Sequence, residues 1–132
     1  MTSIDLNPSQ DKISGGRRIS RGIFMGLSWI LVACITIQVY IAGSAVFQNP
    51  VNWRLHENFV HFFGFAPLLM IIFAITGKCF KGSAWLSLAM FVLIDMQYMT
   101  AHVPALGAIH PVMALVLILL SLYTALRSTP RQ

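Results

Sequence analysis

The chain contains four long apolar runs, and all but one of its charged residues lie outside them, in the terminal segments and in the turns between runs. The runs cover roughly residues 23–47, 59–77, 83–101 and 109–126. Each reaches or approaches the ~17–25 residues that an α-helix needs to cross the hydrocarbon core of a bilayer. Charged residues make up only 10% of the 132 residues, which is too few to cover a soluble globule. The sequence therefore predicts an all-α membrane protein, folded as an antiparallel, up-down bundle of four transmembrane helices.

The basic residues are distributed unevenly over this topology. All but one lie on the side of the membrane that holds both termini, and Arg54 alone lies on the other side. The residues on the first side are Lys12, Arg17, Arg18, Arg21, Lys78, Lys81, Arg127 and Arg131. Positive loops face the cytoplasm, so we expect cytoplasmic N- and C-termini. The net charge of +5 then reflects orientation and contact with the lipid bilayer, and we expect no nucleic-acid partner.

The expected domain limits follow from these runs. A flexible cytoplasmic tail is expected for residues 1–21, which lack apolar periodicity. The four-helix transmembrane domain is expected to cover residues 22–127, and a cytoplasmic C-terminal tail to cover residues 128–132. The first run exceeds the ~7–15 residues of a signal-peptide core, so we expect a retained anchor. Pro67 cannot donate a backbone hydrogen bond and predicts a kink in the second span.

Small and sulfur-bearing residues give two further expectations. Gly22 and Gly26 are spaced so that the first helix can approach a neighbour closely. Cys34 lies inside the first span and Cys79 at the end of the second, so their depths differ and no disulfide is expected.

One uncharged polar or imidazole side chain occurs at nearly the same depth in each run. Gln38, His61 and His110 each lie 17 residues from a basic residue at the cytoplasmic boundary, and Gln97 lies 16 residues from one. At about 1.5 Å of helix rise per residue, all four are roughly 25 Å from that boundary. The sequence thus predicts a shared polar layer near the outer face.

This layer suggests a haem b site. In an up-down bundle the second and fourth helices are diagonal, so His61 and His110 are expected to face each other across the core and ligate the iron. Gln38 and Gln97 would occupy the other diagonal beside the cofactor. His56 is the alternative ligand if the second helix is shifted by a turn. The corresponding function is electron transfer, or redox or ligand sensing.

Glu57 precedes His61 by four residues, one turn along a helix. Its carboxylate can therefore hold the tautomer of that imidazole, as outer partners of metal ligands do. It can equally pair with Arg54 at the surface.

Two alternatives remain open at this point. Polar side chains can satisfy one another across transmembrane helices, so the layer could merely hold the helices together or dock a partner. The histidines could instead bind Cu or Zn, with Met99 or Met113 as soft ligands, or handle protons or ions. No phosphate-binding loop, Cys-x-x-Cys motif or catalytic carboxylate pair is present, so we expect no enzyme activity from this chain alone.

Asp95 is set apart from the polar layer. It lies two residues before Gln97, so its side chain points about 200° away around the helix. An acidic residue inside a transmembrane helix is a functional candidate, either protonated or paired with a partner. A membrane partner subunit or a second copy of the chain is the expected source of such a pair.

Several of these residues carry a family resemblance. They are Gln38-Val39-Tyr40-Ile41-Ala42-Gly43, Trp53-x-x-His56 followed by His61, Gln97, and His110-Pro111. Over roughly residues 20–127 the chain resembles a family of small bacterial membrane proteins known as domain of unknown function 6220. The resemblance implies a four-helix protein of the bacterial inner membrane, with no established activity. The histidine placement is also similar to that of b-type cytochrome bundles.

Overall fold

The computed structural model describes residues 8–130, with side-chain surroundings from residue 15 onward, and is entirely helical apart from its turns. Its elements are α1 (Pro8–Phe47), α2 (Asn52–Phe63), α3 (Ala66–Thr76), α4 (Ser83–Ala101), the 3₁₀-helix η1 (Pro104–Leu106) and α5 (Ile109–Ser128). Four helical segments are long and apolar enough to cross a membrane, with α2 and α3 together forming the second. The predicted all-α bundle with four membrane spans is therefore confirmed.

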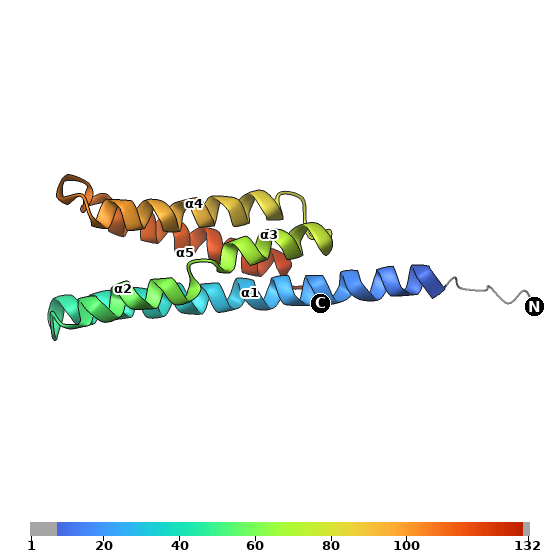
Figure 1. The fold of residues 1–132 in the computed structure, drawn as a ribbon, viewed down its shortest axis with the longest axis horizontal. Coiled ribbons are helices and arrows are strands. Elements are labelled where there is room, and N and C mark those ends of the chain that lie inside the picture. Colours follow the sequence, from blue (N-terminus) through green and yellow to red (C-terminus); the bar gives the residue numbers. More distant parts are fainter. Residues whose placement is uncertain (1–7, 131–132) are drawn as a thin grey trace, which may run out of the picture.

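The four spans lie around a square in sequence order. α1 packs against α2, α3 and α5, and α4 packs against α3 and α5. The turns 77–82 and the end of α5 lie at one end of the bundle, and the turns 48–51 and 102–108 lie at the other (Figure 1). We call these the basic end and the far end, because the basic end carries Arg18, Arg21, Lys78, Lys81 and Arg127.

The second span is broken between α2 and α3. Gly64 and Phe65 separate the two helices, and Pro67 follows as the second residue of α3, where it is buried. Because proline has no backbone N–H, the carbonyl of Phe63 loses the donor that would continue the helix through this point. The kink predicted from Pro67 is confirmed as a break between α2 and α3. This break allows the two helices to pack against different neighbouring helices.

The packed core occupies the half of the bundle nearer the basic end. Phe24, Leu31, Met70 and Met90 are fully buried there. Small polar side chains fill the remaining space, and the Ser121 hydroxyl donates to the Leu117 carbonyl at 2.8 Å and lies 3.3 Å from the Met90 sulfur. Such residues let helices approach closely where lipid supplies no hydrophobic drive between them.

The far half is splayed. There α2 packs along α1, and its contacts with α4 and α5 are at most marginal. The ribbon shows α1 and α2 side by side as one pair and α4 and α5 as another (Figure 1). The space between the two pairs forms the site described below.

The N-terminal segment differs from its expected form. Helix α1 begins at Pro8, so residues 8–21, expected as part of a flexible tail, are helical. Once a helix has nucleated, extending it by a residue fixes few new dihedrals per hydrogen bond, and proline suits its first position. Residues 1–7 and 131–132, which belong to the expected tails, lie outside the described part of the chain.

The close helix approach expected at Gly22 and Gly26 is wrong. A Cβ added at either glycine would meet nothing within 4 Å. The close approach occurs at Gly77 instead, where an added Cβ would lie 3.1 Å from the backbone nitrogen of Arg21. Cys34 and Cys79 are both free, as expected from their depths.

Candidate functional site

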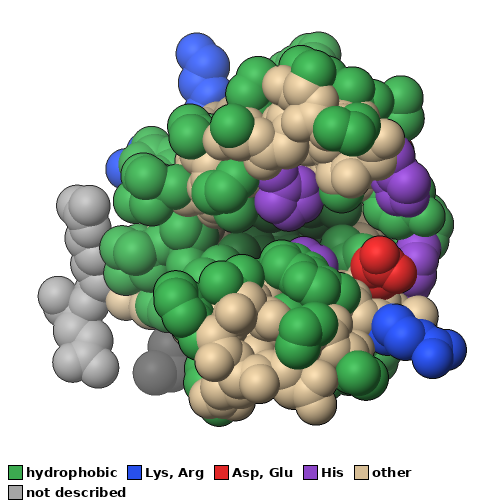
Figure 2. Space-filling view, turned by 90° about the vertical axis from the view of Figure 1, so that its left-hand side faces the viewer, with side chains coloured by type: hydrophobic (Ala, Val, Ile, Leu, Met, Phe, Trp, Pro, Cys, Tyr) green, Lys and Arg blue, Asp and Glu red, His purple; other side chains and the backbone are tan. Residues whose placement is uncertain are grey.

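The splayed half of the bundle encloses a cavity of about 760 Å³ to which α1, α2, α4 and α5 all contribute. We call it the central cavity. Figure 2, which faces the far end, shows this hollow with histidine side chains around it. Most of its lining is apolar, and its polar lining side chains are Thr36, Gln38, Trp53, His56, Glu57, Gln97, Tyr98, His102 and His110. An apolar pocket with a few convergent polar groups is the usual form of a small-molecule or cofactor site.

Gln38 and His56 form a reciprocal pair that joins α1 to α2. The Gln38 side-chain amide donates to the His56 carbonyl at 2.8 Å. The His56 Nδ1 lies 3.2 Å from the Gln38 carbonyl. A carbonyl only accepts, so this contact requires the proton on Nδ1 and leaves Nε2 with a free lone pair.

His110 is held in the same way on the opposite side. Its Nδ1 lies 3.0 Å from the Gln97 carbonyl, joining the start of α5 to α4. The Thr100 hydroxyl donates to that carbonyl at 3.0 Å and lies 3.5 Å from the His110 Nδ1. The carbonyl again fixes the proton on Nδ1, so Nε2 of His110 also keeps its lone pair.

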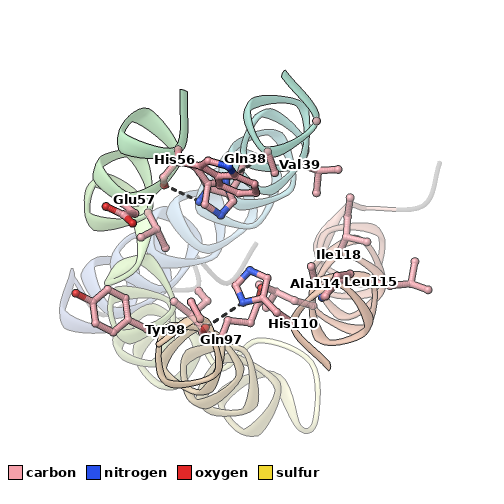
Figure 3. Close-up of a pocket in the computed structure, with 18 of the residues that line it drawn as sticks. Gln38, Val39, His56, Glu57, Gln97, Tyr98, His110, Ala114, Leu115 and Ile118 are labelled. Carbon is pink, nitrogen blue, oxygen red and sulfur yellow. Dashed lines mark hydrogen bonds between the residues drawn. The ribbon is translucent and has the colours of Figure 1, made fainter. Parts of the chain in front are cut away.

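The two imidazoles face each other across the central cavity. Their ring centres are 6.2 Å apart with an interplanar angle of 56°. They project toward the middle of the cavity from α2 on one side and from α5 on the other (Figure 3). A metal–imidazole bond is about 2.0 Å, so two imidazoles on opposite sides of one metal have ring centres roughly 6 Å apart. The observed separation falls at this value.

His61 does not face His110, contrary to the expected diagonal pair. It is exposed, does not line the central cavity, and lies 5.7 Å from the ring of Tyr98. His56 and His61 are five residues apart and so differ by about 140° around α2. Because α2 packs with Gln38 against His56, His61 is turned away from the cavity. Depth along the helix was estimated from sequence, but its rotation was set by packing on α1.

The other candidate residues divide between the cavity and the surface. Gln38, Gln97 and Glu57 line the central cavity. Asp95 is exposed on α4 and does not line the cavity, in agreement with its predicted direction away from Gln97. Asp95 thus lies on the outer surface of the bundle.

The donor set around the cavity is small. Within residues 15–130 no group of three or more His, Cys, Asp or Glu side chains is placed to hold a metal ion. Met99 is exposed, and Met113 is buried outside the cavity lining. Neither expected sulfur ligand is therefore beside the paired imidazoles.

Three residues outside the predicted set of site residues also shape this site. Trp53 packs edge-on against His56 at 5.5 Å, and Thr100 donates to the Gln97 carbonyl. Tyr98 lines the cavity beside His102, with ring centres 4.8 Å apart. The spacing Trp53-x-x-His56 places both side chains on one face of a helix, which was a usable signal. Thr100 and Tyr98 had no comparable signal, since the imidazoles that they meet on other helices, His110 and His61, are distant along the chain.

A family model described as a family of unknown function, DUF6220, matches residues 38–103. The chain belongs to this family. The matched region begins at Gln38, contains His56, His61 and Gln97, and ends before His110. No match to the chain was found among curated proteins or among solved structures.

For this DUF6220 member, the family region therefore contains one imidazole of the facing pair together with its hydrogen-bond partner. It also contains the backbone carbonyl of Gln97 that orients the second imidazole.

Proposed function

We propose that this protein binds haem b in the central cavity, where His56 and His110 would hold the iron, and serves in electron transfer or in redox or ligand sensing. The observation that carries the proposal is the facing imidazole pair with ring centres 6.2 Å apart. In each ring the Nδ1 contacts a backbone carbonyl, so both Nε2 lone pairs are available for a metal. Metal-ligating histidines commonly have their other ring nitrogen fixed in this way.

The shape and lining of the cavity agree with a flat, largely apolar cofactor. The volume of about 760 Å³ is within the range of cofactor pockets. The lining includes the small residues Ala42 and Gly43 of α1 and Ala114 of α5, whose short side chains leave space beside the imidazoles. A Cβ added at Gly43 would meet nothing within 4 Å, which shows how open this wall is.

The donor chemistry favours haem over a bare Cu or Zn ion. Protein zinc sites usually supply three or four side-chain ligands, whereas the described residues offer two facing imidazoles. The macrocycle of haem would supply the ligands that a bare ion lacks, so two histidines of the chain would suffice to hold it.

The buried Gln38 Oε1 is a further feature of the cavity, although haem b with ionised propionates has no donor for it. It is the one buried side-chain oxygen or nitrogen in the described part of the chain that has no hydrogen-bond partner. A buried acceptor without a partner costs roughly 1–3 kcal/mol. Gln38 lines the cavity, so a donor on a bound molecule or a water could satisfy this oxygen.

Haem b, when bound, supplies a reversible one-electron couple between ferric and ferrous iron. The residues of this chain hold and shield it. The carbonyls of Gln38 and Gln97 fix the orientation and tautomer of the imidazoles. The apolar walls lower the local dielectric constant and so tune the reduction potential.

The decisive experiment is an absorption spectrum of the protein purified in mild detergent from haem-replete cells. We expect a Soret band and low-spin α and β bands in the reduced protein. His56→Ala and His110→Ala should each abolish the low-spin spectrum. His61→Ala is the matched control, because His61 lies on the same helix but outside the cavity, and it should retain the bands. A preparation without a Soret band, even after haem is added, would refute the proposal.

A structural role is the second candidate, and the same hydrogen bonds favour it. The Gln38–His56 pair joins α1 to α2, and the His110–Gln97 contact joins α4 to α5. On this reading His56→Leu and His110→Leu destabilise the bundle, and elemental analysis of the wild-type protein finds no iron, copper or zinc. The metal content of the wild-type protein therefore separates the two candidates.

We further propose that the protein lies in the bacterial cytoplasmic membrane with its basic end in the cytoplasm. The family resemblance supports the bacterial membrane, and the eight-to-one division of basic residues supports the orientation. The haem site would then lie near the outer face.

A further inference from the structure

A second hollow lies at the basic end, away from the central cavity. It encloses about 640 Å³ between the start of α1's membrane span, the turn after α3 and the end of α5. We call it the basic pocket. Four cationic side chains line it, from all three of these segments: Arg18, Arg21, Lys78 and Arg127. Within residues 15–130 the acidic residues are Glu57 and Asp95, and neither lines it. Among these described residues, the pocket therefore concentrates positive charge without a counter-charge.

Hydrogen bonds and close packing hold one side of the pocket in place. Arg21 donates from Nε to the Gly77 carbonyl at 2.9 Å and from Nη2 to the Lys78 carbonyl at 3.0 Å. Its guanidinium thus caps the end of α3, where carbonyls lack helical partners. A Cβ at Gly77 would lie 3.1 Å from the Arg21 nitrogen, so α1 and this turn are in direct backbone contact.

An aromatic side chain positions the cation on the opposite side. The Arg127 guanidinium lies over the Phe80 ring, 5.6 Å from its centre. Phe80 in turn packs edge-on against Phe24 at 6.3 Å. These contacts give the pocket an apolar wall directly beside its cations, an arrangement suited to a ligand that is partly charged and partly apolar.

Lys78 occupies a backbone conformation that glycine adopts more easily than lysine. Its φ of 45° lies in the left-handed region, and it is the one non-glycine residue with positive φ among those described. Glycine adopts this conformation without the steric cost that a side chain incurs. A lysine here accepts that steric cost and contributes a cation to the basic pocket.

We propose that the basic pocket binds the phosphate-bearing headgroup of an anionic phospholipid. Arginine and lysine recognise phosphate oxygens through charge-assisted hydrogen bonds. The partly exposed lining residues Met25 and Phe80 can contact the glycerol and upper acyl region of the same molecule. The pocket lies at the ends of the membrane spans, where lipid headgroups are found, and basic pockets between helices at this depth are suited to them.

The test measures lipid retention by native mass spectrometry on the full-length protein in detergent. The probes are dioleoyl phosphatidylglycerol and dioleoyl phosphatidylcholine, which differ in headgroup charge at equal chain length. We expect one phosphatidylglycerol to bind on the order of tenfold more tightly than phosphatidylcholine, and Arg18→Gln to weaken it about fivefold. Lys81→Gln is the matched control, because Lys81 is in the same turn as Lys78 but does not line the pocket. This substitution should change the affinity for phosphatidylglycerol less than twofold.

Lys78→Gly separates binding from folding. It removes both a pocket cation and the strained conformation, so lipid affinity should fall about fivefold while the melting temperature without lipid rises. Equal retention of the two lipids would overturn the proposal, as would an equal loss in Lys81→Gln. Competition by millimolar inorganic phosphate that removes the lipid preference would assign the pocket to a soluble anion instead.

Discussion

Gly77 and Gly43 give a paired test of the packing described above, because alanine at the two positions should change stability in opposite directions. At Gly77 the backbone is not in a conformation that requires glycine, since φ is −76° and ψ is −13°. The backbone alone would thus favour alanine by about 0.5–1 kcal/mol. Yet a Cβ there would lie 2.7 Å from the Phe73 carbonyl oxygen, 3.1 Å from the Arg21 nitrogen and 3.2 Å from the Cys79 sulfur.

The steric cost should exceed the backbone gain at Gly77. Two of the three neighbours are backbone atoms, which cannot rotate away, and forcing an extra methyl into a packed site costs about 1–3 kcal/mol. We therefore expect Gly77→Ala to destabilise the bundle by ~0.5–2 kcal/mol. At Gly43, within α1, a Cβ meets nothing within 4 Å, so Gly43→Ala should stabilise it by ~0.5–1 kcal/mol.

The assay is unfolding of both variants and the wild-type protein in one detergent, followed by circular dichroism during a denaturant titration. The predicted order of stability is Gly43→Ala, wild type, Gly77→Ala. The reasoning fails if Gly77→Ala equals or exceeds the wild-type protein in stability, because the close approach between α1 and the end of α3 would then not exist in solution.

The remaining predictions concern topology, the cavity, Asp95 and Cys79. Reporter fusions after residues 50, 80, 105 and 132 should alternate outside, inside, outside, inside, and a cytoplasmic signal at 50 would contradict the orientation. Gly43→Leu should fold, since its side chain enters open cavity space, but should lose haem binding in the absorption assay. Asp95→Asn should fold normally, because Asp95 is exposed on α4. Loss of a co-purifying partner with retained stability would assign Asp95 to an interface. A marked fall in stability would contradict its exposed position. Burial raises the pKa of the Cys79 thiol above its usual value, with Arg21 opposing the shift, so alkylation should lag behind that of a free cysteine from pH 7 to 9.

The sequence alone determined the fold class and the depth of the polar residues. Each membrane-spanning segment is specified by its own residues, because a continuous apolar run of sufficient length can form all its backbone hydrogen bonds in lipid only as a helix. The break near Pro67 was equally local, since it follows from one missing N–H. Depth along a helix follows from counting residues, so His56, His61, Gln97 and His110 could all be assigned to the far half before any packing was known.

The tertiary structure alone decided which side chains meet. A helix can rotate about its axis without changing the depth of any residue, and the Gln38–His56 contacts fixed the rotation of α2 so that His56 faces His110 and His61 faces outward. The same holds for the glycines: Gly22 and Gly26 had the spacing for close approach, but Gly77 provides it, because α1 meets the end of α3 there. Contacts between helices depend on the mutual fit of surfaces distant in sequence, and no property of a single segment specifies that fit.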